Sequence, residues 1–420
     1  MDKNTIAIHY GYNKDSNMTM AAPIYQSTSY EFESAEQAAN RFSLKELGNI
    51  YTRLANPTSN LLEERIAALE GGVAAIATAS GQSAIFYSLA NVAEAGDNIL
   101  ISNKLYGGTV TLTIHTMKRF GITAKIFDVD NPTTLEALID DKTKAIFFES
   151  ISNPQITIAD IDGIVNIAKK HKILTICDNT VASPALLNPL EHGVDIVVHS
   201  TSKYISGQGL ALGGVIVERD GLRDFFKDSS RYSHFNEPDA SYHGLVYTDL
   251  PFPPFSLRVR LNLLRDIGAT PAPFNSWLLI QSLETLHIRM KEHSRNALDV
   301  AKFLKSHKKV KNVSYPGLES DSQHEKAKKY FPKGHVSGLI NFDVEDFDTA
   351  KELINKTELF SIVVNIGDSK SLIIHPASTT HQQIATDEQL KAGIRPGMIR
   401  LSIGLEDSAD LIADLKKALG

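Results

Sequence analysis

From about residue 60 onward, short apolar runs alternate with amphipathic stretches along the chain. Runs of about five residues rich in Ile, Val and Phe predict strands buried on both faces, because a half-exposed strand alternates apolar and polar positions. These runs are Asn98–Ser102, Ala124–Val129, Ala145–Glu149, Ile173–Cys177, Asp195–His199 and Gly214–Val217. Helices are predicted over Asn60–Glu70, Gln82–Ala93, Thr109–Phe120 and Ile161–His171. The alternation indicates an α/β fold with a mainly parallel sheet covered by helices.

The pattern changes after the last of these strands. Segment 219–260 is rich in proline and aromatic residues and predicts a long connection, and Trp277–Phe303 predicts one long helix. Strands are then expected near Gly338–Val344, Ser361–Val364, Leu372–His375 and Ile399–Ile403, with helices over Asp348–Lys356 and Ser408–Leu419. We therefore predict three parts of the chain. An N-terminal arm (1–60) contacts a neighbouring subunit, and a large domain (61–260) contains the mainly parallel sheet. A smaller C-terminal α/β domain (261–420) contains an antiparallel or mixed sheet.

Composition narrows the classes of protein that fit this pattern. The 420 residues are 42% hydrophobic and 22% charged with a net charge of −6, which is typical of a globular protein and argues against a general nucleic-acid binder. The single cysteine, Cys177, excludes a disulfide framework, and without a visible export signal we expect the cytoplasm. The uncharged run Gly71–Ala93 contains many polar side chains, so we expect a turn and a buried helix there and no membrane span. No metal site is expected, because the histidines show no clustered ligand spacing.

The stretch from Asp195 to Gly209 is the most informative part of the chain. An apolar strand ends in small hydroxyl residues, and Lys203 and a glycine-rich turn follow. Because ligands of open α/β sheets bind beyond the carboxyl ends of strands, Lys203 is a candidate for Schiff-base formation. Ser200 and Ser202 could donate hydrogen bonds to a phosphate. The alternative is an ordinary surface lysine.

Three further features strengthen the case for Lys203. Asp178 ends a buried strand, where it could cap a helix, form a salt bridge or pair with the pyridine nitrogen of pyridoxal phosphate. The Ser80-Gly81-Gln82 turn opens a helix whose free N–H groups favour an anion. Tyr106 follows a strand and could stack on a cofactor ring or simply pack. Lysine, acid, phosphate turn and aromatic together are far more specific than any one of them.

The chain also resembles the Cys/Met-metabolism family of pyridoxal-phosphate enzymes over nearly its whole length. The shared motifs occur in order at Tyr51–Thr58, Ala79–Gln82, Tyr106–Thr109, Glu149–Pro154, Asp178–Thr180, Ser200–Gly209, His375–His381 and Arg400–Glu406. Thr52 and Ser202 replace the serine and threonine that are usual in the family, and both keep a hydroxyl.

The resemblance implies the fold-type-I architecture of aspartate aminotransferase, a pyridoxal 5'-phosphate cofactor and a homotetramer built from two catalytic dimers. It makes Lys203 the Schiff-base lysine, Tyr106 its helper in proton transfer and Asp178 the partner of the ring nitrogen. The implied cofactor contacts are Lys203, Asp178, Ser80, Gly81, Gln82, Tyr106, Asn153, Thr180, Ser200 and Ser202, with Tyr51 and Arg53 reaching the phosphate of the neighbouring subunit. The implied substrate contacts are Arg400, Asn365 and Tyr51.

Two features choose a branch within the family. Asn365, in the pattern Asn-x-Gly-Asp, stands where most lyase and cystathionine γ-synthase relatives have serine, and the Pro238–Gly244 stretch is lacking in shorter relatives. Both are similar to the O-acetylhomoserine sulfhydrylase branch. This similarity implies γ-replacement of acetate by sulfide, or by a small thiol such as methanethiol, on O-acetyl-L-homoserine. An O-succinyl or O-phospho substrate stays open.

Other activities fit the sequence less well. A methionine γ-lyase or a cystathionine γ-synthase would share the early steps, and the Asn365 pattern argues against both. Ser200-Thr-Ser-Lys203 matches the S-x-x-K pattern of serine hydrolases, but S-D-N and K-T-G are missing. Because both Lys203 and Arg400 are present, a non-catalytic cofactor carrier or sulfur-relay partner is disfavoured.

Overall fold

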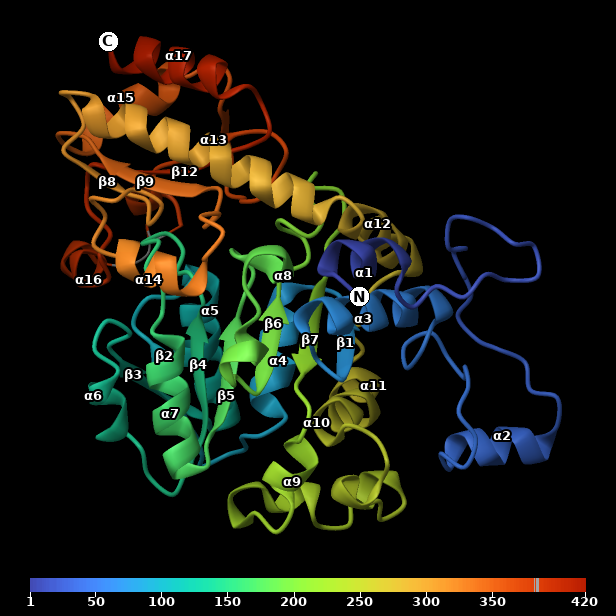
Figure 1. Cartoon of the computed structure of the whole chain (residues 1–420). Coiled ribbons are helices and arrows are strands. Elements are labelled where there is room, and N and C mark those ends of the chain that lie inside the picture. Colours follow the sequence, from blue (N-terminus) through green and yellow to red (C-terminus); the bar gives the residue numbers. More distant parts are fainter. Residues whose placement is uncertain (381, 383–384) are drawn as a thin grey trace.

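A seven-stranded sheet lies at the centre of the larger part of the computed structural model, which describes residues 1–380, 382 and 385–420 (Figure 1). Its strand order is β1-β7-β6-β5-β4-β2-β3. The strands are β1 (Ala74–Thr78), β2 (Asn98–Ser102), β3 (Thr123–Phe127), β4 (Thr143–Glu149), β5 (Leu174–Asp178), β6 (Ile196–His199) and β7 (Gly214–Glu218). All neighbours pair in parallel except β7, which is antiparallel to both β1 and β6. The predicted mainly parallel sheet is confirmed, and β1 is a strand that the pattern did not predict.

Helices cover both faces of this sheet, which explains why its strands are apolar at consecutive positions. One face packs against α3 (Pro57–Glu70) and α7 (Ile161–His171). The other packs against α4 (Gly81–Ala90) and a helical segment made of α5 (Gly107–Thr111), η1 (Leu112–Thr116) and η2 (Met117–Phe120). The uncharged run Gly71–Ala93 therefore contains β1, a turn and α4. Within the described part of the chain, no helix is long and apolar enough to cross a membrane.

Short helical pieces lie in the connections between strands of the large sheet and in the segment that follows β7. They are α6 (Thr133–Glu136), α8 (Ser183–Leu186), η3 (Pro189–His192), α9 (Leu222–Phe226), η4 (Ser230–Phe235), η5 (Ala240–Tyr242), η6 (Tyr247–Asp249), α10 (Pro254–Arg258), η7 (Val259–Leu264) and α11 (Arg265–Ile267). The predicted connection 219–260 contains no strand, and its aromatic side chains Tyr232, Phe235 and Tyr247 are fully buried against the α4 face.

The single long helix predicted over Trp277–Phe303 is wrong. The chain forms α12 (Pro273–Leu283) and α13 (Leu286–Ser306), separated by a break at Glu284 and Thr285. Arg289 stabilises the break, because its guanidinium donates to the Ser282 carbonyl oxygen at 2.8 Å and also to backbone oxygens that follow Lys203. Neither proline nor glycine marks the break in the sequence.

The smaller sheet has five strands in the order β10-β11-β12-β9-β8. They are β8 (Asn312–Ser314), β9 (Leu339–Asp343), β10 (Ser361–Ile362), β11 (Leu372–Ile374) and β12 (Met398–Ser402). The β10–β11 pair is parallel and the others are antiparallel, so the sheet is mixed. It packs against α13, α15 (Phe347–Lys356) and α17 (Ser408–Leu419). The remaining elements are α14 (His324–Tyr330), η8 (Pro376–Ser378) and α16 (Thr386–Lys391); His381, the end of the His375–His381 motif, lies outside the described residues.

The N-terminal segment has almost no core of its own. It contains α1 (Lys3–His9) and α2 (Ala35–Phe42), and the chain between and beyond them extends away from the two sheets (Figure 1). Among residues 1–55, only Ala7 and Ala22 are buried, while large apolar side chains such as Met20 and Leu47 are exposed. The first 60 residues show only weak hydrophobic periodicity, which is why the sequence predicts an arm there rather than a domain. The domain boundaries stay predictions.

Candidate active site

A cavity of about 210 Å³ lies beyond the carboxyl ends of β4, β5 and β6, where residues of the smaller domain close it. All residues predicted for the site, except Tyr51 and Arg53, line this cavity. Its lining also includes side chains for which no role was predicted: Ile85, Thr109, Glu149, Ile151, Val181, Leu212, Val364 and Ile366. The fold therefore brings together motifs that are far apart in the sequence.

Lys203 is half-buried in a turn that follows β6. Its Nζ donates a 2.6 Å hydrogen bond to Oδ1 of Asn365, which comes from the smaller domain. Burial lowers the pKa of Lys203, and the nearby Arg400 guanidinium lowers it further. A lowered pKa increases the neutral fraction of the amine, which is the form that attacks a carbonyl carbon or accepts a proton.

Two carboxyl groups end neighbouring parallel strands in the cavity. Asp178 on β5 is in register with Glu149 on β4. Burial raises the pKa of Asp178, while hydrogen bonds from Thr180 and the nearby His199 act in the opposite direction. Burial and the charge of Asp178 raise the pKa of Glu149 well above its usual value. Both carboxyl groups are therefore harder to ionise than free ones, and Glu149 is the more strongly shifted of the two.

The start of α4 forms the anion-binding end of the cavity. Ser80 caps the helix, accepting the Ser83 N–H at 3.1 Å, and the N–H groups of the first helical residues, Gly81 and Gln82, have no partner within the helix. A Cβ at Gly81 would lie 2.6 Å from Cβ and 2.8 Å from Cα of Ser200. The absence of a side chain at Gly81 thus keeps a narrow cradle between α4 and the loop that follows β6.

Replacing Gly81 by alanine is expected to weaken the binding of pyridoxal phosphate by at least about 10-fold, because the added methyl group meets backbone at Ser200 and displaces the cradle. Titration of the apoprotein with the cofactor, followed by visible absorbance, measures this. Ser83→Ala is the control, since it removes a capping hydroxyl of the same helix and leaves the cradle open. Equal cofactor affinity in Gly81→Ala and the native protein contradicts the assignment.

Arg400 on β12 is buried at the smaller-domain side of the cavity. One Nη donates to Oδ1 of Asn153 at 3.0 Å and the other to the backbone oxygen of Asn365 at 2.9 Å. Its Nε is buried and has no hydrogen-bond partner among the described residues. Burial lowers the pKa of the Arg400 guanidinium to about 10. No carboxylate is bonded to this guanidinium within the described residues, so it can bind the carboxylate of a ligand.

Tyr106 and Asn153 come from two loops that meet at the cavity. Tyr106 precedes α5, and its side chain is 41% exposed at the cavity mouth. Gly108 leaves room for this ring, because a Cβ there would lie 2.5 Å from a ring carbon of Tyr106.

Thr180 also lines the cavity, and its hydroxyl accepts the backbone N–H of Ser200 at 2.8 Å. The Ser202 hydroxyl is engaged with Gly213, donating to its carbonyl at 3.2 Å and accepting its N–H at 3.0 Å.

Tyr51 and Arg53 lie outside this cavity, on the N-terminal arm. The Arg53 guanidinium carbon lies 5.4 Å from the centre of the Tyr51 ring, and the guanidinium donates to the backbone oxygen of Arg265. Tyr51 is 42% exposed. Within one chain, these two residues do not take part in the site, and their predicted contact with a neighbouring subunit is untested.

The sequence alone predicted no role for Glu149 in the site. The residue begins the Glu149–Pro154 motif and ends a predicted strand, but neither position indicated a function. Its register with Asp178 was the signal that could have found it, because both are acids at the ends of adjacent strands.

Cys177 is fully buried in β5, where burial and the neighbouring Asp178 raise its pKa, so it is not suited to act as a nucleophile.

The residues of the cavity fit pyridoxal phosphate. Lys203 can reach an aldehyde, Asp178 can pair with a ring nitrogen, and the start of α4 can hold a phosphate. Three buried polar atoms at the cavity have no hydrogen-bond partner among the described residues: Gln82 Oε1, Thr109 Oγ1 and Arg400 Nε. These are features of a site built around a polar ligand.

Comparison with known proteins agrees with this geometry. The family model described as Cys/Met metabolism PLP-dependent enzyme matches residues 4–420. The O-acetyl-L-homoserine sulfhydrylase of Leptospira meyeri is 46% identical over 99% of this chain and 96% of its own. The homocysteine synthase of Schizosaccharomyces pombe is 43% identical over 99% of this chain and 97% of its own.

A solved structure is also very similar. The crystal structure of a putative O-acetylhomoserine (thiol)-lyase from Campylobacter jejuni, which contains a pyridoxyl-lysine monophosphate, is 57% identical with a TM-score of 0.99, covering 100% of both chains. A lysine bonded to the cofactor in that protein agrees with the place of Lys203 in the cavity.

Proposed function

Because the chain belongs to the Cys/Met metabolism PLP-dependent enzymes, we propose that it replaces the acetate of O-acetyl-L-homoserine by sulfide and releases L-homocysteine. The observation that carries this proposal is the convergence of Lys203, Asn365 and Arg400 in one cavity. Full-length similarity to O-acetyl-L-homoserine sulfhydrylases supports the choice of substrate.

Bound pyridoxal phosphate supplies an aldehyde for the substrate amine and a ring that withdraws electrons from the substrate Cα. Lys203 would hold the aldehyde, and Asp178 would hold the ring nitrogen in its protonated form. Gly81, Gln82 and Ser200 would bind the phosphate at the start of α4. Tyr106 would cover one face of the ring, and Asn153 would contact its edge.

Arg400 orients the substrate by binding its α-carboxylate. The contacts with Asn153 and Asn365 hold the guanidinium in place, and a carboxylate in the cavity can accept from its remaining donors. Because Asn365 also accepts from Lys203, one residue sets the distance between the carboxylate-binding group and the amine. With the carboxylate bound there, the substrate Cα would lie beside Nζ of Lys203.

Lys203 then moves protons on the substrate. Its neutral amine, favoured by burial and by the charge of Arg400, accepts the proton from Cα. Departure of acetate from Cγ requires that a proton also leaves Cβ. Sulfide then adds at Cγ and protons return to Cβ and Cα, with Lys203 as the acid and base beside these carbons. Tyr106 lies at the mouth of the same cavity, where its hydroxyl can assist these transfers. Apolar lining residues such as Ile85 and Leu212 limit the access of water.

The test is a product assay with O-acetyl-L-homoserine in the presence and absence of sulfide. We expect homocysteine and acetate only when sulfide is present. Rapid formation of 2-oxobutanoate and ammonia without a thiol would instead identify a γ-lyase. Parallel assays with O-succinyl and O-phospho substrates, and with methanethiol in place of sulfide, measure the acyl and thiol preferences.

We further propose a homotetramer of two catalytic dimers in which the N-terminal arm reaches the neighbouring cavity. The exposed apolar side chains of the arm and the position of Tyr51 and Arg53 outside their own cavity support this assembly. An arginine on the arm suits a phosphate, because its planar fork can donate two hydrogen bonds. The single, buried Cys177 is compatible with the cytoplasm, which we propose as the compartment.

A further inference from the structure

Glu149 joins the two loops that carry Tyr106 and Asn153 into the cavity. Its Oε1 accepts the backbone N–H of Tyr106 at 2.6 Å, and its Oε2 accepts the backbone N–H of Asn153 at 3.1 Å. The residue is 6% exposed and lines the cavity itself. One side chain therefore sets the separation between the backbones of Tyr106 and Asn153 at the cavity.

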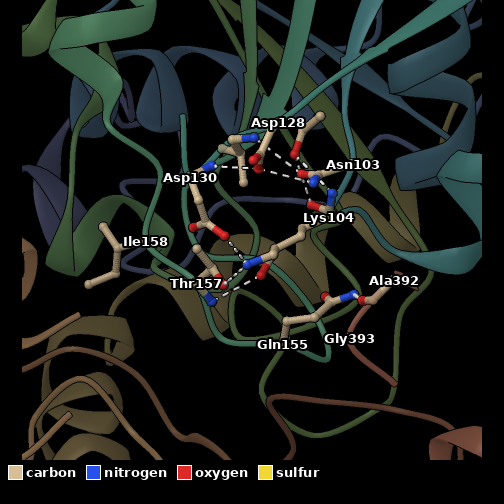
Figure 2. Close-up of polar contacts among 12 residues, drawn as sticks. Asn103, Lys104, Asp128, Asp130, Gln155, Thr157, Ile158, Ala392 and Gly393 are labelled. Carbon is tan, nitrogen blue, oxygen red and sulfur yellow. Dashed lines mark hydrogen bonds and ion pairs between the residues drawn. The ribbon is translucent and has the colours of Figure 1, made fainter. Parts of the chain in front are cut away.

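The same loops are also tied together by residues that do not line the cavity. Figure 2 shows Lys104, two residues before Tyr106, donating to the Thr157 hydroxyl at 3.2 Å while it pairs with Asp130. Gln155 donates to the Ala392 backbone oxygen at 2.8 Å and so anchors its loop to the smaller domain. Because these outer contacts do not involve Glu149, the loops keep an attachment when the Glu149 side chain is changed.

A carboxyl group suits this position better than an amide. The two N–H donors approach two different oxygens, and a carboxyl group offers an acceptor lone pair on both. Glutamine has one oxygen and one NH₂ group, so one backbone N–H would face another donor. Burial and the nearby Asp178 raise the pKa of Glu149, whereas the two backbone N–H groups act in the opposite direction.

We propose that Glu149 is a positioning residue that holds Tyr106 at one face of the cofactor ring and Asn153 at the edge of the ring. Through Asn153, whose Oδ1 accepts from Arg400, it also steadies the group that binds the substrate carboxylate. This inference rests on the proposed function, because it requires pyridoxal phosphate to occupy the cavity.

The test compares the holoenzyme with its Glu149→Gln variant. We expect kcat to fall by about 10–100-fold and KM for O-acetyl-L-homoserine to rise by several-fold, because a small displacement of positioning groups has effects of this size. The visible circular dichroism of the bound cofactor should weaken, since the ring loses its fixed neighbours. If the glutamine variant does not fold, Glu149→Asp, which keeps both oxygens on a shorter side chain, should show a smaller change of the same kind.

Glu218 offers a matched control. It is fully buried, accepts the backbone N–H groups of Phe255 at 3.3 Å and Ser256 at 2.7 Å, and has a pKa raised by burial to about 7. It does not line the cavity. Glu218→Gln should lower the melting temperature while it leaves kcat and the cofactor dichroism unchanged.

The outcomes separate this inference from the proposed function. Unchanged dichroism and kcat in Glu149→Gln overturn the inference, as does a loss of thermal stability like that of Glu218→Gln without any change at the cofactor. A native protein that binds no pyridoxal phosphate overturns the proposed function itself.

Discussion

Lys203→Ala is expected to lower kcat for homocysteine formation by at least about 10³–10⁴-fold, because it removes both the nucleophilic amine and the proton-transfer group. The geometry supports this size of effect, since Lys203 is the only lysine that lines the cavity in the described part of the chain. Steady-state assay of homocysteine measures the loss.

Lys203→Arg is the control for the chemistry of the amine. Arginine keeps a positive charge at about the same place, but its guanidinium stays protonated at neutral pH and cannot act as the neutral nucleophile. We expect it to be as inactive as the alanine variant. Borohydride should fix pyridoxal phosphate covalently to the native protein and to neither variant. A Lys203→Ala variant with native kcat would contradict the proposed role of Lys203.

Asp178→Asn is expected to lower kcat by about 10²–10³-fold, an effect typical of removing one electrostatic partner from the reacting group. Asparagine keeps the size of the side chain and can still accept the Thr180 N–H, which Asp178 Oδ1 accepts at 2.9 Å. It cannot provide the negative charge that holds a protonated ring nitrogen. The measurements are kcat and the affinity for pyridoxal phosphate.

Asp195→Asn is a matched control for this substitution. Asp195 is also buried beside the large sheet, where it accepts from Thr175 at 2.8 Å and pairs with Arg219, but it does not line the cavity. Its replacement should reduce stability and leave kcat per bound cofactor near the native value. An Asp178→Asn variant as active as Asp195→Asn would show that the ring nitrogen needs no charged partner.

Much of the large domain could be predicted because its strands are apolar at consecutive positions. Asn98–Ser102 and Ile161–His171 have the predicted bounds. β1 was missed, because Ala74–Thr78 has only one large apolar residue, Ile76, among small residues in a long uncharged run. The break at Glu284 and Thr285 was missed because tertiary contacts of Arg289, rather than a local breaker, stabilise it.

The candidate site divides in the same way. The chemistry of Lys203, Asp178 and the Gly81 turn follows from residue type and from their places at strand ends and a helix start. The meeting of Lys203 with Asn365 spans 162 residues, and that of Arg400 with Asn153 spans 247. These contacts cannot be predicted from the spacing of the residues along the chain, because they depend on how the smaller domain packs against the larger one.

The sequence by itself determined the fold class, the arm without a core and the residue types from which a pyridoxal-phosphate site can be built. Only the tertiary structure decided that Glu149 lies beside Asp178 and ties Tyr106 to Asn153, and that Tyr51 and Arg53 lie outside the cavity of their own chain. The physical reason is that hydrophobic period and strand-end chemistry are local properties of a sequence. The pairing of strands, the burial of a carboxyl group and the pKa that results are properties of packing.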